Sequence, residues 1–142
     1  MTPRPRTNAS ANAERSNRFD IVSRIGLTLP DVDVRTRYDG SPVLRVDGVF
    51  MAGLAAHESA EPDTLVVRAT PEERDMYIAD APDTYYVTEY YRPYPLVLVR
   101  LRRVTPDALH ELLSSSRRLT LPKTRRHQRR GRAQGMEPHR HD

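Results

Sequence analysis

The residues best suited to chemistry lie in one short aromatic and basic segment. Tyr90, Tyr91, Arg92 and Tyr94 stand close together, interspersed with prolines. Aromatic rings can stack on nucleic-acid bases while a guanidinium group binds phosphate. Tyrosines on strands also pack against sheets for purely structural reasons. The segment is therefore a candidate nucleic-acid contact, and structural packing is the alternative.

A second candidate is a row of arginines on alternate positions of predicted strands. Strand alternation points one set of apolar side chains toward the helices: Leu44, Val46, Leu65, Val67, Val97, Val99 and Leu101. The opposite face then receives Arg45, Arg68, Arg100 and Arg102, with Leu96 and Leu98 among them. Such a row could follow a phosphate backbone. The alternative is a solvated face whose arginines pair with neighbouring carboxylates.

The positive charge is concentrated at the ends of the chain. The net charge is +4, yet residues 16–122 carry 13 cations against 16 anions, and residues 123–142 carry seven cations against two anions. Arg125, Arg126, Arg129 and Arg130 are the densest part of this excess. We expect a salt-sensitive attraction to nucleic acid that does not depend on base sequence. A solvated tail without a dedicated partner is the alternative.

Patterns typical of enzymes are missing from the sequence. The chain has no cysteine, and its five histidines show no metal-ligand spacing. It contains no glycine-rich phosphate loop, and Ser114–Ser116 lack the strand–turn–helix setting of a nucleophile. We therefore expect no catalytic residues, no metal site and no cofactor. The sequence does not exclude an acid–base pair whose two residues are brought together only by the fold.

The spacing of apolar, glycine and proline residues predicts the elements in order. A helix begins at a Ser16 cap and ends between residues 26 and 30, and strands 43–46 and 49–55 flank an Asp47-Gly48 turn. A third strand covers 64–69, and a helix capped by Thr70 follows to about residue 79. Strands 84–90 and 94–101 and a final helix, which fades at Ser114–Ser116, complete the order.

This order, α-β-β-β-α-β-β-α, predicts an α+β fold. We expect a two-layer antiparallel sheet with helices on one face and a more open second face. One domain covers residues 16–122, between a disordered arm at 1–15 and a disordered basic tail at 123–142. No apolar run reaches the roughly 18 residues needed to cross a bilayer, and no secretory signal is visible. A cytoplasmic monomer without membrane contact is the expectation.

Three segments resemble the MmcQ/YjbR family. They are YDGSPVLRVDGVFMAGLA, TLVVRATPEER, and DTYYVTEYYRPYPLVLVRL followed by TPDALHELLSSSRRLTLPK. The resemblance covers about residues 16–123 and implies a fold like that of secretion chaperones. It also implies DNA binding through a paired-wing arrangement. The sequence departs from the family pattern at Val43-Leu44, where an aromatic residue is common, and has few lysines on the hairpin, where Val49 follows the turn.

These observations favour a non-enzymatic module that contacts nucleic acid. The basic tail supplies affinity, and the tyrosine–arginine segment supplies any specificity. The alternative is a protein-interaction module that docks a partner on the open sheet face around Leu96 and Leu98. A third possibility is an unrecognised enzyme or small-ligand binder.

Overall fold

Six antiparallel strands form a single sheet in the order β1-β2-β3-β4-β6-β5. The computed structural model describes residues 18–134, with side chains to residue 121. The strands are β1 (Val32–Thr36), β2 (Pro42–Val46), β3 (Val49–Leu54), β4 (Thr64–Arg68), β5 (Tyr85–Tyr86) and β6 (Leu96–Arg100). The helices are residues 18–26, α2 (Pro71–Asp80) and α3 (Pro106–Gln134). The predicted α+β class and helix–strand order are confirmed; the Ser16 cap lies outside the described residues.

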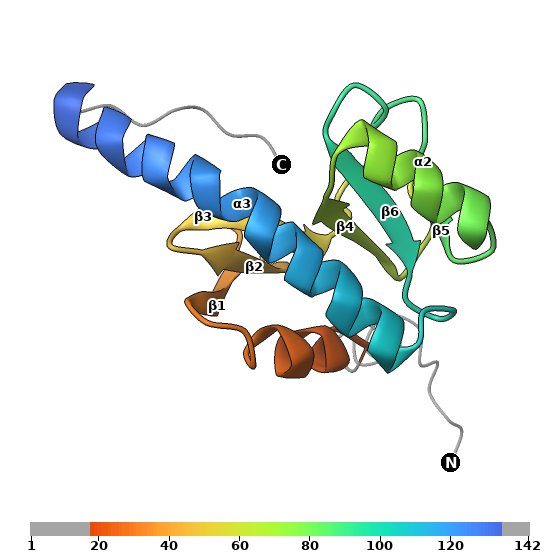
Figure 1. The fold of residues 1–142 in the computed structure, drawn as a ribbon. Coiled ribbons are helices and arrows are strands. Elements are labelled where there is room, and N and C mark those ends of the chain that lie inside the picture. Colours follow the sequence, from red (N-terminus) through yellow and green to blue (C-terminus); the bar gives the residue numbers. More distant parts are fainter. Residues whose placement is uncertain (1–17, 135–142) are drawn as a thin grey trace, which may run out of the picture.

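All three helices cover one face of the sheet (Figure 1). Phe19 and Val22 come from the first helix, and Leu109, Leu112 and Leu113 come from α3. They pack on the strand residues that alternation had assigned to this face: Leu44, Val46, Leu65, Val67, Val97 and Val99. Gly26 allows the close contact of helix and sheet, since a Cβ there would lie 2.6 Å from a Leu44 methyl. The predicted inward face is confirmed.

Local turn chemistry sets the register of the β2–β3 hairpin. Asp47 and Gly48 have φ angles of 50° and 83°, the left-handed values that a two-residue hairpin requires. The structure adds β1, which pairs with β2 in a stretch that the sequence predicted only as a connection. Only Val32 of β1 is buried, so its apolar signal is weak.

The α2 helix begins with the predicted capping box. The Thr70 hydroxyl accepts a hydrogen bond from Glu73 N, and the Glu73 carboxylate accepts one from Thr70 N. Together these contacts satisfy two of the amides that every helix start leaves without a helical partner. Pro71 occupies the first turn, where its missing amide costs nothing.

The helix end predicted at Ser114–Ser116 is wrong, because α3 continues to Gln134. A bulge between β2 and β3 leaves the Met51 carbonyl facing α3, and the buried Ser116 hydroxyl donates to it. Thr120, also buried, donates to the Ser116 carbonyl. These polar side chains belong to the packed face of the helix. Residues 123–134, predicted as a disordered tail, continue α3, and residues 135–142 lie outside the described part.

The second face of the sheet carries a core of its own. Val66, Tyr91, Leu96 and Leu98 are buried there, with partly buried side chains packed around them: Phe50, Ala55, Ala60, Tyr86 and Val87. The covering residues come largely from two loops, 55–63 between β3 and β4 and 87–95 between β5 and β6. The predicted exposure of Leu96 and Leu98 is therefore wrong. No helix in the described part is long and apolar enough to cross a membrane.

Candidate nucleic-acid interface

The tyrosine–arginine segment lies in the loop between β5 and β6, and this loop is longer than predicted because β5 contains only Tyr85 and Tyr86. A buried arginine of α2 holds this loop in place. Arg74 Nη1 donates to the carbonyls of Arg92, Tyr94 and Leu96 at 3.3, 3.2 and 3.4 Å. Arg74 is only 7% exposed. One guanidinium thus donates to three carbonyls of this segment, of which the Tyr94 carbonyl also accepts from Leu96 N at 2.9 Å.

Tyr91 points inward and anchors the loop. Its side chain is 4% exposed, and its hydroxyl accepts a hydrogen bond of 3.1 Å from His57 N in the neighbouring loop. Burial, more than any neighbouring group, raises the pKa of the Tyr91 phenol above its usual value. Tyr91 therefore positions the loop by packing, the structural role that the sequence left open for these tyrosines.

Tyr90 and Tyr94 point outward, with exposed fractions of 49% and 39%. The Tyr90 ring lies flat on the His57 imidazole, with centroids 3.4 Å apart and an interplanar angle of 7°. Its centroid is 6.4 Å from that of Tyr94. Arg92 lies between them in the chain, exposed and 3.4 Å from the Glu89 carboxylate. We call His57, Tyr90, Arg92 and Tyr94 the aromatic loop surface.

The two loops are tied together beside this surface. The Ser59 and Thr88 hydroxyls lie 2.9 Å apart, within hydrogen-bond distance. The Tyr86 hydroxyl accepts from Glu61 N at 2.8 Å and lies 2.6 Å from the Thr64 hydroxyl. These contacts link residues 22 to 29 positions apart. The aromatic loop surface is consequently held by side chains on both sides of it.

The outward arginines of the sheet are bound to the protein itself. Arg45 donates to the Gly48 carbonyl at 3.4 Å, and Arg68 donates to the Phe50 carbonyl at 3.2 Å. Arg100 forms two 2.9 Å contacts with Glu61, and its guanidinium lies 4.1 Å from the Tyr86 ring centroid. Their outward direction is confirmed. These contacts match the alternative in which the arginines solvate and stabilise the face.

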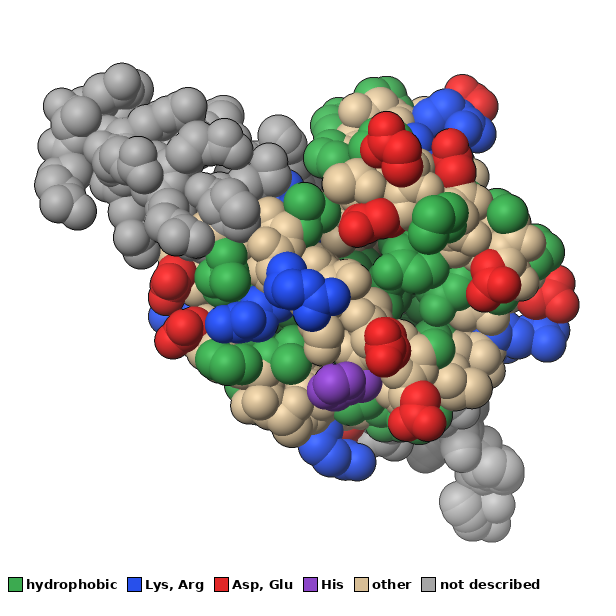
Figure 2. All heavy atoms as spheres, viewed as in Figure 1, with side chains coloured by type: hydrophobic (Ala, Val, Ile, Leu, Met, Phe, Trp, Pro, Cys, Tyr) green, Lys and Arg blue, Asp and Glu red, His purple; other side chains and the backbone are tan. Residues whose placement is uncertain are grey.

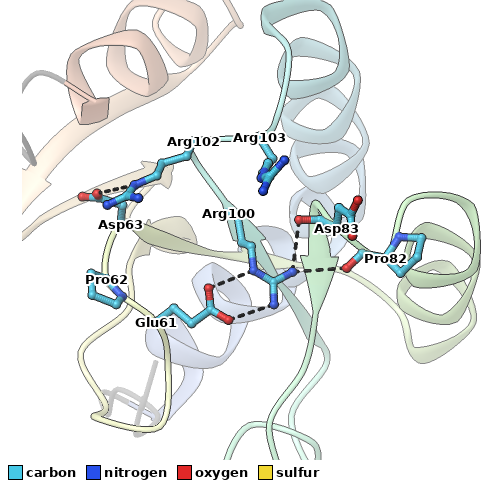
Figure 3. Close-up of a pocket in the computed structure, with 8 residues that line it drawn as sticks. All are labelled: Glu61, Pro62, Asp63, Pro82, Asp83, Arg100, Arg102 and Arg103. Carbon is cyan, nitrogen blue, oxygen red and sulfur yellow. Dashed lines mark hydrogen bonds and ion pairs between the residues drawn. The ribbon is translucent and has the colours of Figure 1, made fainter.

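Arg100 and Arg102 line a hollow of about 380 Å³ at one end of β6 (Figure 3). Arg100 also donates to the Pro82 and Asp83 carbonyls at 3.2 Å each. Hydrogen bonds from Arg100 lower the pKa of the Glu61 carboxyl, and the same contacts raise the pKa of Arg100. The charged groups of the lining balance, with three arginines and three carboxylates: Arg100, Arg102, Arg103, Glu61, Asp63 and Asp83.

Asp63 is the buried member of this lining. Its side chain is 8% exposed, and its Oδ2 forms ion pairs with Arg18 Nε at 3.1 Å and Arg102 Nε at 3.4 Å. The residue has a φ of 60°, and its Oδ1 has no hydrogen-bond partner among the described residues. These two ion pairs fasten the first helix to the end of β6. Within the described part, no group of three or more histidines and carboxylates is arranged to hold a metal ion.

In a comparison with known protein families, residues 27–119 match the YjbR family model. The chain belongs to the YjbR family. No curated protein and no solved structure matches it. The matched span of the YjbR domain runs from the end of the first helix to Leu119 in α3, so it includes the aromatic loop surface and the hollow. The resemblance stated from sequence is confirmed at the level of the family.

The basic residues predicted to bind nucleic acid through the tail fall in the last part of α3. Arg125, Arg126, Arg129 and Arg130 belong to the helical backbone of this YjbR-family protein, while their side chains lie outside the described part. The ribbon of α3 extends past the sheet in this region (Figure 1). From Lys123 to Gln134 the helix contains six cationic residues and no acidic residue.

The described part of the helix-covered face has mixed charges, unlike the basic end of α3. Figure 2 shows carboxylates, arginines and hydrophobic side chains interspersed over the described part of this face. Alternating charges of both signs solvate a surface without attracting a polyanion strongly. Within the described residues, the aromatic loop surface is thus the better candidate for contact with nucleic acid.

Three residues of the site were missed from sequence. His57 stacks on Tyr90 across 33 positions, Arg74 reaches carbonyls 18 to 22 positions away, and Asp63 binds Arg102 across 39 positions. Nothing near His57 marks it as a stacking partner. Arg74 sits in the first turns of a charged helix, a setting typical of exposed residues. Asp63 precedes a strand, where a turn residue is common.

Proposed function

We propose that this YjbR-family protein is a non-enzymatic module that contacts nucleic acid. The observation that carries the proposal is the pair of exposed tyrosines, Tyr90 and Tyr94, held on a fixed loop on either side of Arg92. Exposed rings of this kind stack on bases without sequence preference, and an adjacent guanidinium binds phosphate. Buried anchors keep the loop in one geometry, which lowers the entropy lost on binding.

The stacking geometry favours unpaired bases. One face of the Tyr90 ring is against His57, so a base would extend this stack from the ring's other face. Bases inside a duplex are stacked on each other and offer no free face. Single-stranded nucleic acid is therefore the expected ligand. The basic end of α3 supports the proposal through charge, since its six cations attract any polyanion.

The experiment is a fluorescence-anisotropy titration of labelled single-stranded and duplex oligonucleotides across a range of salt. Tyr90→Ala and Tyr94→Ala should each weaken single-strand binding roughly tenfold, because base–aromatic stacking contributes about 1–3 kcal/mol per base. Tyr38→Ala is the matched control, since Tyr38 is fully exposed at the tip of the β1–β2 hairpin, outside the aromatic loop surface. Unchanged affinity in both loop variants would reject the loop as the contact.

Charge and stacking separate in the same titration. Replacing Arg125, Arg126, Arg129 and Arg130 by glutamine in the full chain should reduce the salt slope, by about 0.7 for each cation that contacts a single-strand phosphate. The tyrosine variants should shift affinity while leaving that slope in place. If the arginine variant alone loses binding, the folded body has another role and the proposal is wrong.

A further inference from the structure

β1 leaves one edge of the sheet without a neighbouring strand among residues 18–134 (Figure 1). It comprises Val32–Thr36, with the sequence VDVRT, and all of it beyond Asp33 is exposed. Open edges present amides and carbonyls that readily pair with another strand. What could pair with this edge depends on which backbone groups it presents and in what order its side chains lie.

The pairing of β1 with β2 decides which backbone groups face outward. Arg37 N donates to Ser41 O at 2.8 Å, and Asp47 N donates to Asp31 O at 3.4 Å. In an antiparallel pair, hydrogen-bonded residues alternate with residues whose backbone groups point away from the partner. The odd-numbered residues of β1 therefore bond to β2. The amides and carbonyls of Val32, Val34 and Thr36 face the open edge.

A second copy of β1 fits this edge when the two strands are paired about Val34. In that register the outward backbone groups of Val34 meet those of Val34 in the other copy, and Val32 meets Thr36. Asp33 then lies opposite Arg35 of the other copy, and the reverse holds by symmetry. Directly opposed charges of opposite sign stabilise antiparallel strands. Within one chain the two side chains already attract each other, at 2.7 Å.

Other registers bring like charges together. A shift to pairing about Val32 would place Asp31 opposite Asp33, and pairing about Thr36 would place Arg35 opposite Arg37. Pairing about Asp33 or Arg35 would also let outward backbone groups meet, but it would place that residue directly opposite its own copy, carboxylate against carboxylate or guanidinium against guanidinium. Charged edge strands usually resist self-pairing; the order Asp-Val-Arg, centred on an outward amide, removes that resistance in one register only.

We propose that β1 is a self-association surface that pairs with β1 of a second copy about Val34. The result is a two-fold symmetric dimer with one sheet continuous through both copies and the helices of both on the same side. Val34, now 36% exposed, is covered by its symmetry mate. This inference departs from the monomer expected from sequence and does not depend on the proposed nucleic-acid contact.

The dimer should be weak and depend on concentration. A pair of five-residue strands buries less than the contact area of about 1,000 Å² that is expected of a stable interface. Asp33 and Arg35 are also well exposed, at 47% and 64% of their side-chain area, so solvent screens their attraction. Main-chain hydrogen bonds and the covered Val34 provide the rest.

Sedimentation equilibrium of the full chain, from micromolar to submillimolar concentration, tests the proposal directly. The wild-type protein should shift from monomer to dimer. Arg35→Glu places Glu opposite Asp33 and should weaken the dimer about tenfold, because two symmetric contacts change from attraction to repulsion. The exchange variant Asp33→Arg/Arg35→Glu reverses both charges and should restore association. Since Asp33 lies opposite Arg45 within the chain, circular dichroism checks the fold of that variant.

Amide hydrogen exchange by NMR gives a second readout. The amides of Val34 and Thr36 should exchange more slowly as protein concentration rises, while those of Asp33 and Arg35 should be protected at every concentration. Val34→Pro removes the central outward donor, which faces away from β2, and should abolish the dimer. Proline is tolerated on an edge strand for this reason.

Three results would overturn the proposal. They are a protein that remains monomeric throughout, a dimer unaffected by Arg35→Glu and Val34→Pro, and a Val34 amide protected at every concentration. The last result would mean that another part of the same chain, such as residues 1–17, covers the edge.

Discussion

At the scale of single residues, buried charged groups position the candidate site. Arg74 donates to three carbonyls at once, so its loss removes a donor from each of them, although the Tyr94 carbonyl keeps Leu96 N as a second donor. Arg74→Met keeps the apolar stem and removes the guanidinium. We expect a loss of about 2–4 kcal/mol in the free energy of unfolding, since hydrogen bonds to charged groups each contribute about 1.5–3 kcal/mol. Urea denaturation measures it.

Arg24→Met is the matched control for this substitution, because Arg24 is an exposed arginine on the first helix. Its effect should stay within about 0.5 kcal/mol. If both variants lose the same stability, the contacts of Arg74 do not hold the loop, and Tyr91 alone must do so.

The Glu61–Arg100 pair predicts a pH dependence of stability. Hydrogen bonds from Arg100 lower the pKa of the Glu61 carboxyl below its ordinary value of 4.5. The unfolded chain lacks this partner, so the pair stabilises the fold above that value and ceases to do so as pH falls through the lowered pKa. The Tm of Glu61→Gln should thus lie below that of the wild type near neutrality, and the gap should close in acid. In an Arg100→Gln background, adding Glu61→Gln should change the Tm little at any pH. A Tm difference between wild type and Glu61→Gln that stays constant with pH would contradict the stabilising role of the ion pair.

Residue types revealed candidates but not contacts. The spacing in the sequence marked Tyr90 and Tyr94 as candidates but left stacking and packing open, whereas strand alternation predicted the outward direction of Arg45, Arg68 and Arg100. The hydrogen bonds of Arg68 to the Phe50 carbonyl and of Arg100 to Glu61 do not follow, because these partners lie 18 and 39 positions away in the chain. The stacking of Tyr90 on His57 could not be predicted for the same reason, since the two residues lie 33 positions apart. Long-range pairing of this kind is decided by the packed fold and leaves no local pattern.

At the scale of elements, the start of α2 shows how much a local signal, the Thr70 N-cap, stabilises a helix. Thr70→Ala removes the hydroxyl that accepts from Glu73 N, and we expect a loss of about 1 kcal/mol in the free energy of unfolding. Thr70→Ser keeps an accepting oxygen and is the matched control, expected to lose much less. Thermal denaturation of both variants gives the comparison. An equal loss in the two would show that the threonine methyl, and not the cap, stabilises the helix.

Element boundaries were predicted where local chemistry sets them and were wrong where packing does. The Asp47-Gly48 turn and the Thr70 cap depend on neighbouring residues only, and both are confirmed. β1 has one buried residue and little periodicity, so its strand forms through pairing with β2. The serines of α3 suggested an end, yet the bulge at Met51 gives Ser116 an acceptor and the helix continues.

At the scale of the whole molecule, the two faces of the sheet are covered differently, one by helices and the other by loops. The helix face holds the main core, and the other face holds a smaller core under loops that present Tyr90 and Tyr94. The basic part of α3 reaches past the sheet (Figure 1). Contact with nucleic acid would then combine one surface of fixed aromatic rings with a separate source of positive charge.

The proposed dimer gives this arrangement a consequence that can be measured. Two copies joined at β1 carry two aromatic loop surfaces and two basic helix ends, so a long strand can bind both while a short one binds only one. Because the second contact becomes intramolecular, the long oligonucleotide should bind wild type more tightly than Arg35→Glu, at concentrations where the wild type is dimeric. The exchange variant Asp33→Arg/Arg35→Glu should regain the difference.

The short oligonucleotide is the control in that comparison, since it should bind all three proteins alike. If Arg35→Glu weakens long and short strands equally, Arg35 contacts nucleic acid itself and the gain does not come from two linked sites. If the dimer forms but length makes no difference, the two loop surfaces are too far apart, or wrongly directed, for one strand to bridge. The length dependence therefore tests whether self-association and nucleic-acid contact act together, apart from whether each occurs.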